Sequence, residues 1–179
     1  MLPNQFGLIA MFHVVVGIIA WPTLRLKVQK YSYHIFQSDV IDFNITEIED
    51  GQTLFYDFKK DNLMLSINNN IRFEDGNKEF SIEFMNKTSD VCKIFSNRRH
   101  DPIVGLFFEI LQEKTPTLPK KCPIKKQIVS VPLQNFETNK LPPIWPRTSI
   151  LFEMRLYSYT KKIFKPLLNL TMIVNLQKK

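Results

Sequence analysis

The sequence predicts a mainly β domain of antiparallel strands with a single amphipathic helix. Apolar and polar side chains alternate over five separate segments, which is typical of strands that have one face toward a core and one toward water. One segment, residues 101–115, instead repeats apolar residues at helical spacing. The only two cysteines, Cys92 and Cys122, lie on either side of that segment.

The N-terminus carries an uncharged apolar run, residues 6–21, followed by Pro22, Arg25 and Lys27. Its length fits the apolar part of a signal peptide better than a membrane-spanning helix, which needs about 20 apolar residues. We therefore expect a signal peptide over residues 1–20, a single domain over residues 21–179, and secretion to the extracellular space. A retained membrane anchor is the alternative, because no Lys or Arg precedes the run.

The alternating segments begin at residues 39–47 and end at residues 167–176. Two weaker candidates, residues 53–58 and 127–133, bring the expected number of strands to about seven. Residues 74–77, Glu-Asp-Gly-Asn, predict a tight turn between two strands. The five segments place the following side chains on the inner face: Ile41, Phe43 and Ile45; Leu63, Leu65 and Ile67; Phe80, Ile82 and Phe84; Phe152, Met154 and Leu156; Leu168, Leu170, Met172, Val174 and Leu176.

The helix is expected over about residues 101–114. Asp101 is a candidate N-cap, Pro102 suits the first helical position, and Pro116 ends the run. The apolar stripe that the spacing places toward the core consists of Ile103, Leu106, Phe107, Ile110 and Leu111.

The two cysteines predict a disulfide, because the apolar leader indicates an oxidising compartment. A Cys92–Cys122 bond would tie together the ends of the helical excursion and contribute about 3–4 kcal/mol of stability by loop-closure entropy. Two buried free thiols in a cytosolic protein are the alternative.

Sequons for N-glycosylation occur at Asn44, Asn86 and Asn169. We expect Asn44 and Asn169 on the polar faces of their strands and Asn86 at the end of its strand.

Catalytic and metal-binding chemistry is not indicated. His34 and His100 are far apart and in no metal-ligand spacing, and the sequence contains no P-loop, GxSxG, HExxH or GxGxxG motif. We expect no catalytic residue, no metal and no cofactor, and hence no enzyme. The net charge of +7 is scattered rather than gathered in a block, so a nucleic-acid partner is not expected either.

The inner face is strongly aromatic and aliphatic, and it would form either a solid core or an apolar cavity. The residues that we expect to line that core or cavity are Phe80, Ile82, Phe84, Leu106, Phe107, Phe152 and Met154. Basic pairs at Lys120–Lys121, Lys125–Lys126 and Lys161–Lys162 are interpreted mainly as surface charge. A ring around an opening that attracts an anionic head group is the alternative.

The motifs "DVCKIF", "KKCPI", "LPPIWP" and "LFEMRLYS", in this order, resemble a known family. The chain is similar to the insect secreted proteins grouped as domain of unknown function 1091, which are similar to the ML (lipid-recognition) superfamily. Cys92 and Cys122, with Asp90 and Pro123 beside them, match the family's paired cysteines.

That resemblance implies an immunoglobulin-like β-sandwich whose two sheets open around a hydrophobic ligand, lipid or hydrocarbon-like, with relatives in lipid transfer and chemosensation. It implies no catalytic residue and at most transient contact with membranes. The alternative is a solid-cored extracellular interaction or structural glycoprotein that binds no small ligand.

Overall fold

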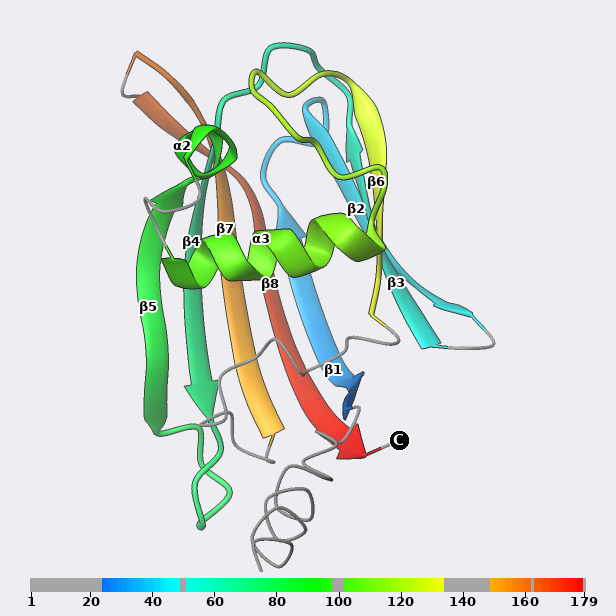
Figure 1. Cartoon of the computed structure of the whole chain (residues 1–179), viewed down its shortest axis with the longest axis vertical. Helices are drawn as coiled ribbons and strands as arrows, with labels where there is room; N and C mark the ends of the chain where they lie inside the picture. The colour runs from blue at the N-terminus through cyan, green and yellow to red at the C-terminus, as the bar shows by residue number, and fades with distance from the viewer. Residues whose placement is uncertain (1–23, 49–50, 98–101, 134–148, 162, 179) are drawn as a thin grey trace, which may run out of the picture.

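The computed structural model describes residues 24–48, 51–97, 102–133, 149–161 and 163–178. The expected signal peptide, residues 1–20, lies outside these described residues. Within them the chain forms eight strands and two helices (Figure 1). In chain order these are β1 (Leu24–Ile35), β2 (Ile41–Ile48), β3 (Gly51–Phe58), β4 (Leu65–Phe73), β5 (Ile82–Asp90), α2 (Val91–Ser96), α3 (Pro102–Lys114), β6 (Gln127–Pro132), β7 (Ser149–Thr160) and β8 (Ile163–Lys178).

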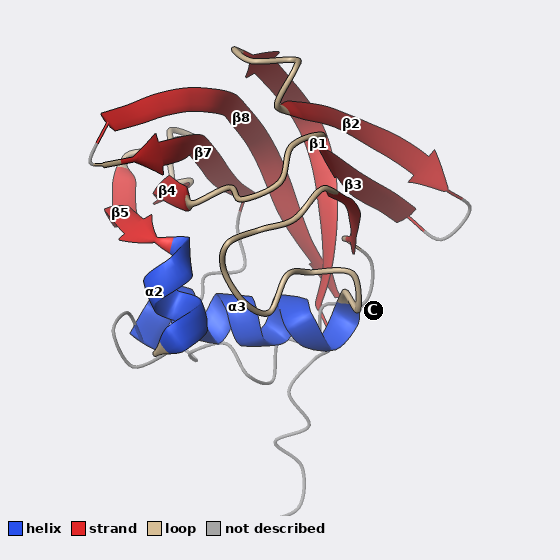
Figure 2. Cartoon of the chain, turned by 90° about the horizontal axis from the view of Figure 1, so that it is seen from above, coloured by secondary structure: helices blue, strands red, loops and turns tan. Residues whose placement is uncertain are grey.

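The strands form two antiparallel sheets, as the alternation predicted. The larger sheet has the order β1-β8-β7-β4-β5, and the smaller has the order β2-β3-β6. Seen from above, the sheets diverge, and α2 and α3 lie together on the open side (Figure 2). The fold is therefore a β-sandwich with a helical cover, and the expected mainly β class is confirmed.

The core is centred on β8, which pairs with β1 on one side and β7 on the other. Its alternation is as predicted, because Leu168, Leu170, Met172 and Val174 are buried. The predicted inner-face residues of β2 are also buried, from Ile41 at 0% exposed to Ile45 at 8%. In these strands one face is buried against the core. Apolar residues therefore recur at every second position, and this period is enough to identify the strands in the sequence.

The prediction for residues 80–84 was correct in part: a strand is present and Phe84 packs against a core cluster, but the position of Ile82 was wrong. Phe80 precedes the strand, and Ile82 begins it on the outer edge of the larger sheet, where it is 52% exposed. The β4–β5 register then shifts, so that Ile71 faces Met85 while Arg72 faces Glu83. Phe84 is the extra residue of this bulge, and Met85 takes the buried position instead.

Strand β1 was not predicted. Its register with β8 shifts between Val28 and Lys30, which interrupts the period of two within the strand. Apolar and polar residues do alternate on either side of this shift, with Val28 before it and Tyr31 and Tyr33 after it, but both tyrosines are exposed on an edge strand. Its place in the sheet comes from main-chain pairing with β8 over nearly its whole length.

Helix α2 was also missed because it is only six residues long. The Asp90 carboxylate caps it by accepting hydrogen bonds from the backbone N–H groups of Cys92 and Lys93 at 2.9 and 3.1 Å. Helix α3 runs over Pro102–Lys114, close to the predicted bounds. It crosses in front of the sheets between β5 and β6 (Figure 1).

Candidate functional site

A cavity of about 300 Å³ lies between the two sheets beneath α3. Both sheets, both helices and the segment between α3 and β6 contribute to its lining. The strand residues that line it are Leu54, Tyr56, Phe58, Leu65, Ile67, Asn69, Ile71, Met85, Val129, Val131, Ile150, Phe152, Met154, Leu156, Met172 and Val174. The helices and loops add Val91, Phe95, Val104, Phe107, Phe108, Ile110, Leu111, Leu118, Pro119, Ile124 and Leu133.

The cavity exists because the sheets meet at one edge and separate at the other. Near the closed edge, the backbone N–H of Val28 in β1 donates to Oε1 of Gln52 in β3 at 3.0 Å. At the opposite edges lie β5 and β6, which α3 spans as a cover (Figure 2). Apolar side chains of α3 fill only part of the gap between these edges, which leaves the cavity.

Three residues of the predicted α3 stripe, Phe107, Ile110 and Leu111, line the cavity. Val104, Phe107, Phe108 and Leu111 follow helical spacing and line the cavity, whereas Leu106 does not. The predicted stripe had included Leu106 because apolar residues occur on more than one side of this helix, and spacing alone does not fix its rotation.

The lining is almost entirely apolar. Asn69 and Tyr56 bring the only polar side-chain atoms among the described lining residues, apart from the thioether sulfurs of methionines. Burial raises the pKa of the Tyr56 phenol above its usual value, so this hydroxyl stays neutral at physiological pH. Such a site can hold an apolar molecule, since each CH₂ group removed from water contributes about 0.8 kcal/mol.

Asn69 is the residue of the site that the sequence did not reveal. It lies on the inner face of β4 between Ile67 and Ile71, and it is 6% exposed. It is the middle residue of a run of Asn68, Asn69 and Asn70, which reads as a polar loop or strand edge. A signal was present in the alternation, because continuing the inner positions Leu65 and Ile67 by two residues leads to Asn69.

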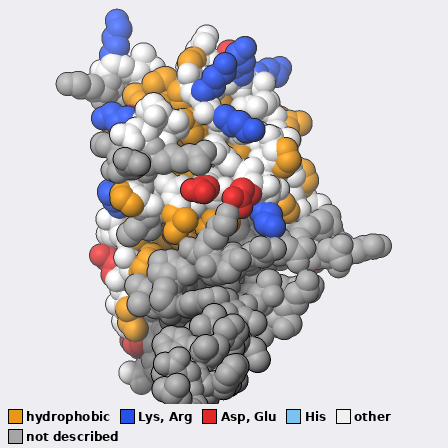
Figure 3. Space-filling model, in the orientation of Figure 1, with side chains coloured by type: hydrophobic (Ala, Val, Ile, Leu, Met, Phe, Trp, Pro, Cys, Tyr) orange, Lys and Arg blue, Asp and Glu red, His pale blue; other side chains and the backbone are white. Residues whose placement is uncertain are grey.

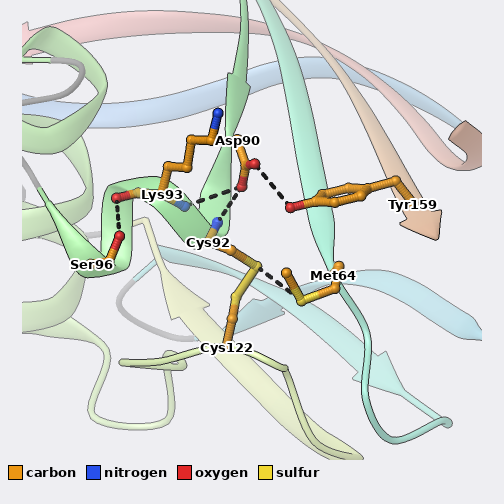
Figure 4. Close-up of a disulfide and its surroundings, with 7 residues drawn as sticks. All are labelled: Met64, Asp90, Cys92, Lys93, Ser96, Cys122 and Tyr159. Carbon is orange, nitrogen blue, oxygen red and sulfur yellow. Dashed lines mark hydrogen bonds between the residues drawn. A yellow bond between two sulfur atoms is a disulfide. The ribbon is translucent and has the colours of Figure 1, made fainter. Parts of the chain in front are cut away.

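The predicted disulfide is present. The Sγ atoms of Cys92 and Cys122 are 2.06 Å apart, and the bond closes a separation of 30 residues that contains α3. Cys92 belongs to α2 and Cys122 to the segment that leads back toward β6, so the bond fixes both ends of the helical cover (Figure 4). The Met64 Sδ atom contacts the Cys92 sulfur at 3.8 Å.

Asp90 joins the disulfide region to the β7–β8 hairpin. While its Oδ1 atom caps α2, its Oδ2 atom accepts a hydrogen bond from the Tyr159 hydroxyl at 2.9 Å (Figure 4). Partial burial and the neighbouring Asp90 carboxylate raise the pKa of Tyr159 to about 12. One carboxylate therefore positions both the start of the cover and a strand of the larger sheet.

Of the seven predicted lining residues, Phe107, Phe152 and Met154 line the cavity. Phe80, Ile82, Phe84 and Leu106 are not part of its lining. Phe84 instead packs against Phe73, with ring centroids 5.1 Å apart and the rings tilted by 43°, in a smaller cluster beside the main core.

The three sequons differ in accessibility. Asn44 and Asn86 are exposed, and Asn169 is half-buried on β8, which lies between β1 and β7. Asn86 lies in the middle of the edge strand β5 rather than at a strand end as expected, because β5 continues to Asp90.

The basic pairs lie at the surface. Lys120, Lys121, Lys125, Lys126 and Lys161 are exposed and outside the cavity lining, while Lys162 is not among the described residues. Lysine and arginine side chains are spread among apolar ones over the upper part of the face that Figure 3 shows.

Across the described ranges there is no group of His, Cys, Asp and Glu that could hold a metal ion. Neither of the two described helices is long and apolar enough to cross a membrane.

Part of the chain matches a protein-family model. No curated protein and no solved structure matches the chain. The segment that does match a family model, residues 65–152, runs from the start of β4 into β7 and includes both cysteines, both described helices and Asn69. Over this segment the chain is similar to the family described as "Protein of unknown function (DUF1091)", in agreement with the resemblance noted in the sequence.

Proposed function

We propose that the protein is a secreted, non-enzymatic binding protein that holds a lipid or hydrocarbon-like molecule between its two sheets. The observation that carries this proposal is the apolar cavity of about 300 Å³ under α3. This volume is at the lower end of the range for small-molecule sites in proteins, which are mostly apolar with a few placed polar groups.

The chemistry of the lining supports binding rather than catalysis. Its described side chains include no carboxylate, imidazole, thiol or amine that would act as a general acid, a general base or a nucleophile. The free energy of binding would come from the apolar surface that the ligand buries: an apolar chain of about ten carbons gains roughly 8 kcal/mol when fully buried. Because association itself costs several kcal/mol, affinity should rise steeply with chain length.

The covalent structure supports action outside the cell. A disulfide persists in oxidising compartments, and here it anchors the cover of the cavity at both ends. The apolar leader and the exposed sequons at Asn44 and Asn86 fit the same compartment. The resemblance noted in the sequence implies relatives in lipid transfer and chemosensation, which fits a hydrophobic ligand and a chemosensory use of such a carrier.

Native mass spectrometry tests this function. The full-length chain is expressed in insect cells, purified from the medium and sprayed under non-denaturing conditions. We expect the mature glycoprotein together with an additional species that carries one lipid-sized mass, and we expect solvent extraction to remove that mass. Peptide analysis of the same material reports the N-terminus and the occupancy of the sequons.

The solid-cored interaction protein predicts a different result. Its spectrum would show only the glycoprotein mass, and extracted protein would not take up an added long-chain ligand. Retention of the protein in the cell with Met1 at its N-terminus would contradict the secreted form.

A further inference from the structure

The Tyr56 side chain projects from the smaller sheet into the space between the two sheets. Tyr56 lies on the middle strand β3, directly opposite Phe43 of β2 on one side and Val129 of β6 on the other. Both of these neighbours are buried, as are Leu54 and Phe58 on the same face of β3. Side chains in a strand stand roughly perpendicular to the sheet. Because the ring is surrounded within its own layer, its hydroxyl is directed toward the opposite sheet and the cavity that Tyr56 lines.

Packing holds the Tyr56 ring in this position. Phe43 is 3% exposed, and its ring contacts that of Tyr56 with centroids 4.9 Å apart and the planes tilted by 54°. This contact involves only the rings, so it does not require the hydroxyl. The hydroxyl is therefore presented to the cavity by a side chain that is already ordered, which lowers the entropy cost of a hydrogen bond to a ligand.

The Tyr56 hydroxyl is surrounded by protein and is still accessible from the cavity. Burial raises the pKa of the phenol above its usual value. Among the described residues, the side-chain oxygens that are fully enclosed without a hydrogen bond are Asn69 Oδ1, Asn70 Oδ1, Thr115 Oγ1 and Asn175 Oδ1. The Tyr56 hydroxyl is not one of them, and within the described structure it forms no hydrogen bond either. It therefore keeps surface that a molecule in the cavity can touch.

We propose that the cavity selects apolar ligands that carry one neutral carbonyl oxygen, which accepts a hydrogen bond from the Tyr56 hydroxyl. This inference rests on the proposed function, and it narrows the ligand class to long-chain ketones, aldehydes and esters. A phenolic O–H is a donor that a carbonyl oxygen satisfies.

Other ligand classes fit the lining less well. No Lys or Arg side chain belongs to the described lining, so a carboxylate would lose its hydration without gaining an opposite charge. A hydrocarbon would displace water from the Tyr56 hydroxyl and leave this donor without a partner.

The test compares two ligands that differ only in the acceptor. One is methyl nonyl ketone, and the other is its methylidene analogue, in which a CH₂ group replaces the carbonyl oxygen. Binding of each to solvent-extracted full-length protein is measured by displacement of a fluorescent apolar probe. The variant Tyr56→Phe removes the hydroxyl and keeps the ring contact with Phe43. The matched control is Tyr31→Phe, which removes a hydroxyl from a residue that is 43% exposed and outside the cavity lining.

We expect Tyr56→Phe to weaken binding of the ketone about three- to tenfold and to leave binding of the methylidene analogue equal or tighter. Tyr31→Phe should keep the wild-type affinities for both ligands. Infrared spectroscopy of the bound ketone gives a second measurement. Its carbonyl stretching band should lie at lower frequency in wild type and Tyr31→Phe than in Tyr56→Phe, because only the first two proteins donate a hydrogen bond to the oxygen.

The outcomes separate this inference from the proposed function. If both ligands bind wild type and Tyr56→Phe with an unchanged ratio of affinities, or if the carbonyl band is the same in both proteins, the donor role of Tyr56 is wrong while the carrier function stands. If neither ligand displaces the probe, or the probe itself does not bind, both the function and the donor role are wrong.

Discussion

Removal of the Cys92–Cys122 disulfide should cost a large part of the protein's stability. The change is the double substitution Cys92→Ser and Cys122→Ser. The bond closes a separation of 30 residues, for which loop-closure entropy gives about 3.6 kcal/mol at 25 °C. Domains of this size are typically stable by about 5–15 kcal/mol, so the variant should remain folded but only marginally.

Urea unfolding at equilibrium, followed by far-UV circular dichroism, measures this loss. Wild-type protein in reductant serves as the control and should lose the same free energy as the variant. Hydrogen exchange should localise the loosening to residues 102–124, because α3 keeps its apolar contacts but loses the bond across its ends. A loss below about 1 kcal/mol, or uniform loosening of all strands, would show that the bond does not anchor the cover.

Two further predictions concern the sheet and its hairpin. The neutral form of Tyr159 is favoured in the folded state, because its pKa is raised from 10.0 to about 12 beside Asp90. The stability that Tyr159 contributes is therefore complete below pH 10 and is lost as the pH rises through 12. The free energy of unfolding of Tyr159→Phe should decline less over that pH interval than that of the wild type. Leu168 is 0% exposed, so Leu168→Ala should lower the free energy of unfolding by about 2–5 kcal/mol, and Ile163→Ala, at a position 65% exposed, should change it by less than about 0.5 kcal/mol. Similar losses at the two positions would contradict the assigned core.

Strands with one buried face could be predicted from the sequence. In β2 and β8 the inner positions from Ile41 to Ile45 and from Leu168 to Val174 are buried, as the period of two indicates. Leu167 is buried as well, at the point where the β7–β8 register shifts. The helix α3 was also predictable, because its proline boundaries and apolar content are local features.

Strands β1 and β5 could not be predicted equally well, and the reason is physical. In β1 and β5 a bulge inserts one extra residue, so inner and outer positions exchange partway along the strand. Ile82 and Met85 illustrate this, since the sequence assigned Ile82 to the core and Met85 to the solvent. A bulge depends on the pairing partner, β4 or β8, and a single sequence does not show that partner.

The site itself was predictable in type but not in detail. An apolar inner face is evident from composition, but whether it encloses space depends on how far the sheets diverge. Phe107, Phe152 and Met154 line the cavity. In the sequence Asn69 looks like an ordinary polar residue, and its place in the lining is evident only from the pairing of β4 with β5 and β7.

A cavity-filling substitution tests the central claim most directly. Val129→Phe adds an aromatic side chain at a cavity-lining position that is 2% exposed, and Ile128→Phe adds one to the opposite face of β6, where Ile128 is 60% exposed. Binding of a long-chain apolar ligand to each folded variant is measured by displacement of a fluorescent apolar probe. We predict that Val129→Phe weakens binding at least about tenfold while Ile128→Phe binds like the wild type. Equal, wild-type affinity in both folded variants would show that the ligand does not occupy the space between the sheets.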